Sequence, residues 1–138
     1  MFLKISKNII EEEAKALLLL AKSLDTNYNK VLSVISKANG NIILSGVGKS
    51  GHIARKIAST LTSTGTPAYF IHPTEASHGD LGLINKKDIL FLLSKSGKSK
   101  ELLDLLNFAN NNNIKSILIS SNKKSKLAQI SSHNLIIP

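Results

Sequence analysis

The clearest signal of the fold is the segment Asn41-Ile42-Ile43-Leu44-Ser45-Gly46-Val47-Gly48-Lys49-Ser50-Gly51. Its first half is a compact apolar run of strand length, and a glycine-rich turn leads from it directly into a helical pattern at about residues 52–64. Strands that alternate with helices predict a parallel sheet. The same rhythm continues, with further apolar runs at residues 68–71, 89–93, 117–119 and 135–137, and further helical patterns at about residues 99–112 and 124–131.

Four of the five strand runs are apolar on successive residues, which is typical of strands covered by helices on both faces of the sheet. The sequence therefore predicts an α/β fold, a three-layer sandwich around a five-stranded parallel sheet, with the flavodoxin-like strand order as the first choice. Two helical patterns precede the sheet, at residues 8–25 and at about 27–37. The first is amphipathic, and we expect Glu11, Glu12 and Glu13 in its first turn.

The composition fits one soluble domain over residues 1–138, with 42% hydrophobic residues and no cysteine. The lack of cysteine excludes disulfide frameworks, thiolate metal clusters and a cysteine nucleophile. The longest apolar run, residues 16–21, is far shorter than the roughly 18 residues needed to span a bilayer, and the first residues do not resemble a signal peptide. We therefore expect a cytoplasmic protein without a membrane partner.

The net charge of +9 raises the question of a nucleic-acid partner, because clustered basic residues bind phosphate backbones. Of the 18 basic residues, however, only Arg55 is an arginine, and the lysines are scattered along the chain. Aromatic residues, which would stack on bases, make up only 4%. These features argue against nucleic-acid binding.

Ligands bind beyond the carboxyl ends of the strands in such sheets, so the glycine-rich turn at residues 45–51 is the first place to look for a ligand. It is not a Walker P-loop, because Ile43 stands where that motif needs a glycine. The dinucleotide pattern G-x-G-x-x-G is present, but no acidic residue ends the second strand to hold a ribose. Lys49 and Ser50 suit a compact phosphate, and the alternative is a tight turn without a ligand.

The loops after the second and third strands also carry polar side chains. Residues 94–101 offer three serine hydroxyls and a glycine, which suit a phosphate monoester; the alternative is that Ser99 simply caps a helix. Residues 72–82 combine two histidines with Glu75 and Asp80, which suit sugar hydroxyls, proton exchange or a divalent metal. Their spacing matches no compact metal signature.

Four blocks of sequence in order resemble the sugar isomerase (SIS) domain of the D-arabinose 5-phosphate isomerases: residues 46–56, 63–67, 72–82 and 94–102. The resemblance extends over residues 8–138. It implies a flavodoxin-like SIS domain and interconversion of arabinose 5-phosphate and ribulose 5-phosphate, which supplies the Kdo sugar of lipopolysaccharide or capsule. SIS domains also serve as ligand-responsive modules in regulators, so a non-catalytic sugar-phosphate-binding module is the alternative, and a nicotinamide-binding protein is a distant third reading.

The resemblance also implies roles for individual residues. Lys49 and Glu101 match catalytic positions, Lys49 as the cation that stabilises an oxyanion and Glu101 as the base or its partner. No cofactor is implied, apart from a possible divalent metal ion near His72. The implied partners are a small-molecule sugar phosphate and further copies of the chain, since the family forms tetramers. The expected substrate-binding residues are Gly48, Ser50, Gly65, Thr66, His72, His78, Ser94, Ser96, Gly97 and Ser99.

The chain also departs from the family. The family continues beyond the position of Pro138 through segments that supply a further catalytic Glu and His, and then through a pair of CBS domains. Lys98 stands where the family often has an acidic residue or Gln. We therefore expect a C-terminally short SIS domain that binds phosphate. Whether it isomerises the sugar without the later Glu and His is a separate question. Its exposed apolar surface favours oligomerisation.

Overall fold

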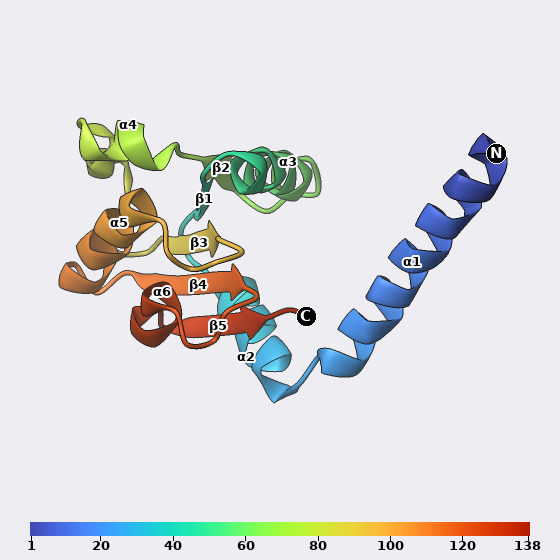
Figure 1. Cartoon of the computed structure of the whole chain (residues 1–138). Coiled ribbons are helices and arrows are strands. Elements are labelled where there is room, and N and C mark those ends of the chain that lie inside the picture. The colour runs from blue at the N-terminus through green and yellow to red at the C-terminus, as the bar shows by residue number, and fades with distance from the viewer.

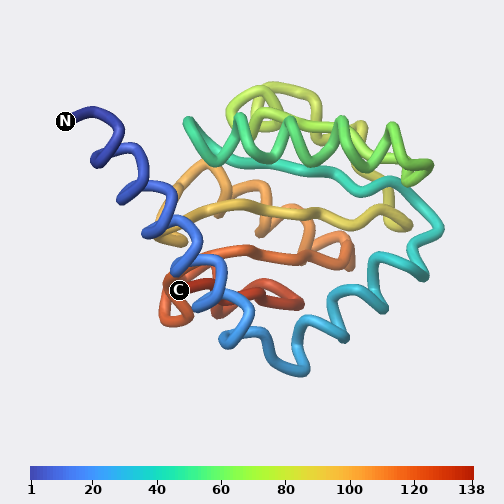
Figure 2. Tube along the Cα trace, turned by 90° about the vertical axis from the view of Figure 1, so that its right-hand side faces the viewer, coloured from blue at the N-terminus to red at the C-terminus, as the bar shows by residue number.

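Five parallel strands form one sheet in the order β2-β1-β3-β4-β5, in a computed structural model that describes all residues from Met1 to Pro138 (Figure 1). This is the flavodoxin-like order, so the sequence prediction is confirmed. Figure 2 shows β1, β3, β4 and β5 lying side by side in that order. The strands are β1 (Ile42–Gly46), β2 (Ala68–Phe70), β3 (Ile89–Leu93), β4 (Lys115–Ser120) and β5 (His133–Ile136).

Helices cover both faces of the sheet and divide the core into two apolar clusters. The cluster on one face joins Val31 of α2 (Thr26–Ser36) and Ala54 of α3 (Lys49–Ser63) to the strands. The cluster on the other face contains side chains of α5 (Lys100–Asn111), α4 (Pro73–Ser77) and α6 (Lys126–Ile130). Every residue of β1 and β3 is buried, as the unbroken apolar runs predicted, and the three-layer sandwich is confirmed.

The N-terminal helix α1 (Phe2–Ser23) differs from the sequence prediction. It begins at Phe2, because Phe2, Leu3 and Ile5 continue the helical pattern toward the N-terminus. The three glutamates therefore lie in mid-helix and not in its first turn. No residue of α1 is buried, and Figure 1 shows the helix standing apart from the sheet. None of the helices is both long and apolar enough to cross a bilayer.

Several predicted boundaries also shift. The segment at residues 72–82, predicted as a loop, contains α4 and the short 3-10 helix η1 (Asp80–Leu83). Pro73 starts α4, because its fixed backbone torsion suits the first helical position, and the His72 side chain caps that helix. The strand predicted at residues 135–137 begins earlier, at His133, which pairs with Ile117 of β4. These differences leave the three ligand-facing loops at the carboxyl edge of the sheet.

Candidate functional site

Close packing at Gly46 and Gly51, and backbone conformation at Gly48, explain the three glycines of the turn between β1 and α3. A methyl group on Gly51 would lie 2.6 Å from the carbonyl oxygen of Gly46, so helix and strand touch here backbone to backbone. Gly48, the N-cap residue of α3, has a φ of 58°, a conformation that favours glycine. The G-x-G-x-x-G spacing therefore follows from the close packing of α3 on β1 and from the positive φ at Gly48, and it does not require a dinucleotide.

The serine loop, residues 94–99, folds back on itself after β3. Ser94 is buried, and its hydroxyl oxygen accepts a hydrogen bond from the backbone N–H of Gly97, which has a φ of 65°. The Ser96 hydroxyl accepts a hydrogen bond from the N–H of Lys98 in the same way. Both hydroxyls act only as acceptors within the chain, so both keep their protons free to donate to an anion.

Ser99 occupies the N-cap position of α5, but its hydroxyl does not cap the helix. It donates instead to Oε2 of Glu101 at 2.9 Å. The helix-cap alternative is thus correct for the backbone position and wrong for the side chain. Ser99 links the serine loop to the carboxylate that the sequence singled out as catalytic.

A pocket of about 430 Å³ lies between the loops that follow β1, β3 and β4. Ser121 and Asn122, from the loop between β4 and α6, form a wall of this pocket that the sequence analysis missed. The signal that would have found them is their position directly after the fourth strand run, at the same edge of the sheet. The lining residues are Val47, Ser50, Leu93, Ser94, Lys95, Ser96, Ser99, Leu102, Ser121 and Asn122.

Glu101 is exposed and ionised at neutral pH. Its pKa is lowered, chiefly because the carboxylate accepts a hydrogen bond from its own backbone N–H, and further because it accepts one from the Ser99 hydroxyl. The positive charge of Lys100, and that of His72 when its ring is protonated, also lower this pKa. The influence of His72 indicates that the segment after β2 lies near the start of α5, and α4 does pack against α5.

His72 is half-buried and its ring is held by two contacts. Its Nδ1 accepts a hydrogen bond from the N–H of Thr74 at 3.3 Å, and the ring lies edge-on to Phe70. A neutral ring held in this way carries its proton on Nε2, which leaves no free lone pair for a metal. No group of three or more His, Asp or Glu side chains gathers anywhere in the chain to hold a metal ion. The arrangement around His72 therefore does not fit a metal site.

The remaining predicted residues divide between the two edges of the sheet. Lys49 is the first residue of α3, beside the pocket, and its side chain is exposed. His78 directly follows α4 as its C-cap and is also exposed. Gly65 and Thr66 lie at the opposite edge, after the far end of α3, which is about 22 Å long at 1.5 Å per residue. Within one chain, the structure does not bring Gly65 and Thr66 to the pocket.

Comparison with known proteins agrees with this architecture. The family model of the SIS domain matches residues 34–138. An uncharacterised protein of Rickettsia prowazekii is 43% identical over 134 residues, which are 97% of this chain and 42% of that protein. Arabinose 5-phosphate isomerase KpsF of Escherichia coli O6:H1 is 48% identical over 124 residues, 89% of this chain and 38% of the isomerase.

A solved structure of an E. coli CFT073 protein in complex with arabinose 5-phosphate superposes with a TM-score of 0.93 at 36% identity, covering 99% of this chain and 73% of that one. The chain spans about two fifths of the length of the curated relatives named above, 42% and 38% respectively. The resemblance drawn from the sequence is thereby confirmed. The chain belongs to the SIS domain family, and its named relatives include arabinose 5-phosphate isomerases.

Proposed function

We propose that the chain binds a sugar phosphate in the pocket behind the serine loop and forms part of an aldose–ketose isomerase acting on D-arabinose 5-phosphate and D-ribulose 5-phosphate. The main support for this proposal is the pocket itself, which is lined by the serine loop with its free hydroxyl protons. The ionised Glu101 adjoins it through the hydrogen bond from Ser99. The relatives named as arabinose 5-phosphate isomerases support this substrate. In this proposal the enzyme works in the cytoplasm and supplies the Kdo sugar of lipopolysaccharide or capsule.

The phosphate group would occupy the serine loop. The Ser94 and Ser96 hydroxyls supply hydrogen-bond donors, and Lys95 brings a positive charge to the pocket lining. Lys98 and Lys100, close to Lys95 in the sequence, are exposed and add positive charge to this part of the surface. The N-terminus of α5 adds only about 0.3–1 kcal/mol of favourable dipole interaction, so the hydrogen bonds supply most of the affinity. Lys98, the departure from the family pattern, strengthens the attraction of a dianion.

The reaction moves one proton between adjacent carbons of the open-chain sugar. A base removes the proton from C2 of the aldose, the electron pair of the broken C–H bond forms an enediolate, and the proton is returned to C1 while the proton of the C2 hydroxyl passes to the C1 oxygen. The Lys49 ammonium would stabilise the oxyanion of the enediolate. The lowered pKa keeps Glu101 ionised but makes it a weak base, which favours its role as partner of another base.

An NMR time course of the purified chain with arabinose 5-phosphate tests this proposal, with Glu101→Gln as the control. Formation of ribulose 5-phosphate by the wild type and not by the variant is the expected result. Line broadening of the sugar without conversion would overturn the catalytic part and leave the non-catalytic sugar-phosphate-binding module. The absence of both would overturn the proposed pocket.

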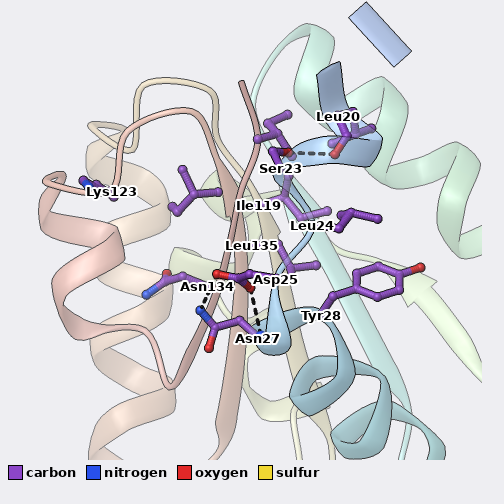
Figure 3. Close-up of a pocket in the computed structure, with 12 residues that line it drawn as sticks. Leu20, Ser23, Leu24, Asp25, Asn27, Tyr28, Ile119, Lys123, Asn134 and Leu135 are labelled. Carbon is purple, nitrogen blue, oxygen red and sulfur yellow. Dashed lines mark hydrogen bonds between the residues drawn. The ribbon is translucent and has the colours of Figure 1, made fainter. Parts of the chain in front are cut away.

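We also propose that the chain is a homo-oligomer. Along α1 the exposed apolar residues Leu3, Ile10 and Leu17 recur every seven residues, and Leu24 follows at the same interval as the C-cap residue; a helix normally buries such a stripe. An apolar pocket of about 510 Å³ adjoins this stripe at the end of α1, lined also by the start of α2, by β5 and by the residues after it (Figure 3). A second copy that covers both surfaces would account for their exposure.

A further inference from the structure

We propose that Asn122 is a positioning residue of the phosphate pocket, which fixes the serine loop by holding the carbonyl group of Ser96. This inference rests on the proposed function, because it concerns the same pocket. Asn122 lies in the loop between β4 and α6, and neither the sequence motifs nor the family resemblance assigned a role to that loop.

Both ends of the Asn122 side chain are engaged. Its Oδ1 accepts a hydrogen bond from the backbone N–H of Lys124 at 3.1 Å, and its Nδ2 donates to the carbonyl oxygen of Ser96 at 3.3 Å. The first contact sets the orientation of the amide, because a backbone N–H can only donate. The donor end must therefore face the serine loop. The Asn122 backbone N–H is itself bound to the Ser120 hydroxyl.

The peptide unit between Ser96 and Gly97 is consequently held at both ends. Its carbonyl group accepts from Asn122, and its N–H donates to the Ser94 hydroxyl at 3.1 Å. The C=O and N–H of a trans peptide point in opposite directions, so these two contacts fix the plane of the unit. Gly97 has no side chain to resist a rotation of this peptide, so we expect the plane to turn more freely when one contact is lost.

The peptide unit between Lys95 and Ser96 is also held, by residues at the end of β4 and at the start of the loop between β4 and α6. The carbonyl oxygen of Lys95 accepts two hydrogen bonds at 3.1 Å, from the Ser120 hydroxyl and from the Ser121 N–H. The N–H of Ser96 therefore points away from the β4–α6 loop, and it has no hydrogen-bond partner within the chain. This N–H is a further free donor for an anion, and its direction depends on the clamp.

The expected effect of losing Asn122 follows from one neutral hydrogen bond, whose net contribution corresponds to a change in affinity of about threefold to tenfold. The test is titration of the full 138-residue chain with inorganic phosphate, followed through the amide resonances of Ser96 and Gly97 by NMR. Asn122→Ala removes both side-chain contacts. Asn122→Asp keeps the acceptor for Lys124 but places an oxygen against the Ser96 carbonyl.

Asn110→Ala is the matched control, because the Asn110 side chain also donates to a backbone carbonyl, that of Ile130, at the opposite edge of the sheet. We expect both Asn122 variants to bind phosphate about threefold to tenfold more weakly than the wild type, with Asn122→Asp at least as weak as Asn122→Ala. Asn110→Ala should bind phosphate like the wild type and have a melting temperature similar to that of the Asn122 variants. Wild-type affinity in Asn122→Ala, or an equal loss in Asn110→Ala, overturns the positioning role. No phosphate-dependent shift in the wild type overturns the proposed function itself.

Discussion

Replacing Gly51 with alanine tests whether close packing of α3 on β1 is the reason for the glycine pattern. Alanine favours a helix over glycine by up to about 1 kcal/mol, so helix propensity alone predicts a gain in stability. The added methyl group, however, would lie 2.6 Å from the carbonyl oxygen of Gly46, and that strand is hydrogen-bonded to β2 and β3 and cannot withdraw. Overpacking of this kind costs up to about 3 kcal/mol, which leaves a net loss of about 2 kcal/mol.

A loss of this size lowers the melting temperature by about 8 °C in a domain of this length, as measured by circular dichroism. Gly82→Ala is the control, because a methyl group there meets no atom within 4 Å and the backbone has an ordinary φ, so its melting temperature should stay level or rise slightly. A Gly51→Ala variant that melts at or above the wild-type temperature would refute the packing argument. The glycine would then be explained by a ligand that approaches the turn.

Three further predictions test other parts of the structure. Ser99→Ala should raise the pKa of Glu101 toward its ordinary value in a carboxyl NMR titration, because the hydroxyl that favours the carboxylate is removed. Since the pKa of Glu101 is lowered in the wild type, its ionised carboxylate stabilises the folded state at neutral pH, and this stabilisation is lost as the pH falls through the lowered pKa. The Ser99→Ala variant should therefore lose less of its free energy of unfolding over the same fall in pH. The double variant Ile10→Glu, Leu17→Glu should scatter light as a 14.9 kDa monomer while the wild type gives a multiple of that mass; equal masses would contradict the proposed α1 interface. Asp88→Ala should destabilise the chain by about 3 kcal/mol in urea unfolding, because the buried carboxylate accepts hydrogen bonds from two backbone N–H groups and one amide; an unchanged midpoint would show these donors find other partners.

The alternation of strands and helices was predictable because it depends on local patterns. Unbroken apolar runs marked β1 and β3, and the glycine turn marked the junction of β1 with α3. The start of α1 and the helices inside residues 72–82 were missed, because exposed apolar residues and a short proline-led turn give weak signals. The serine loop could be singled out as a candidate anion site, since its hydroxyls and glycine are adjacent in sequence, and anion binding there stays a prediction.

Which loops meet in one pocket depends on the pairing of strands that are distant in the sequence. Strand order is a long-range property: β3 lies between β1 and β4, so Ser50, the serine loop and Asn122 converge, although they are far apart in the sequence. The length of α3 carries Gly65 and Thr66 to the other edge, although the resemblance grouped them with the sugar site. The layered fold and the polar side chains of each loop can therefore be read from the sequence alone, because period and composition are local. The assembly of those loops, and the clamp on the Ser96 peptide, required the packed sheet, because only pairing between distant strands brings their ends together.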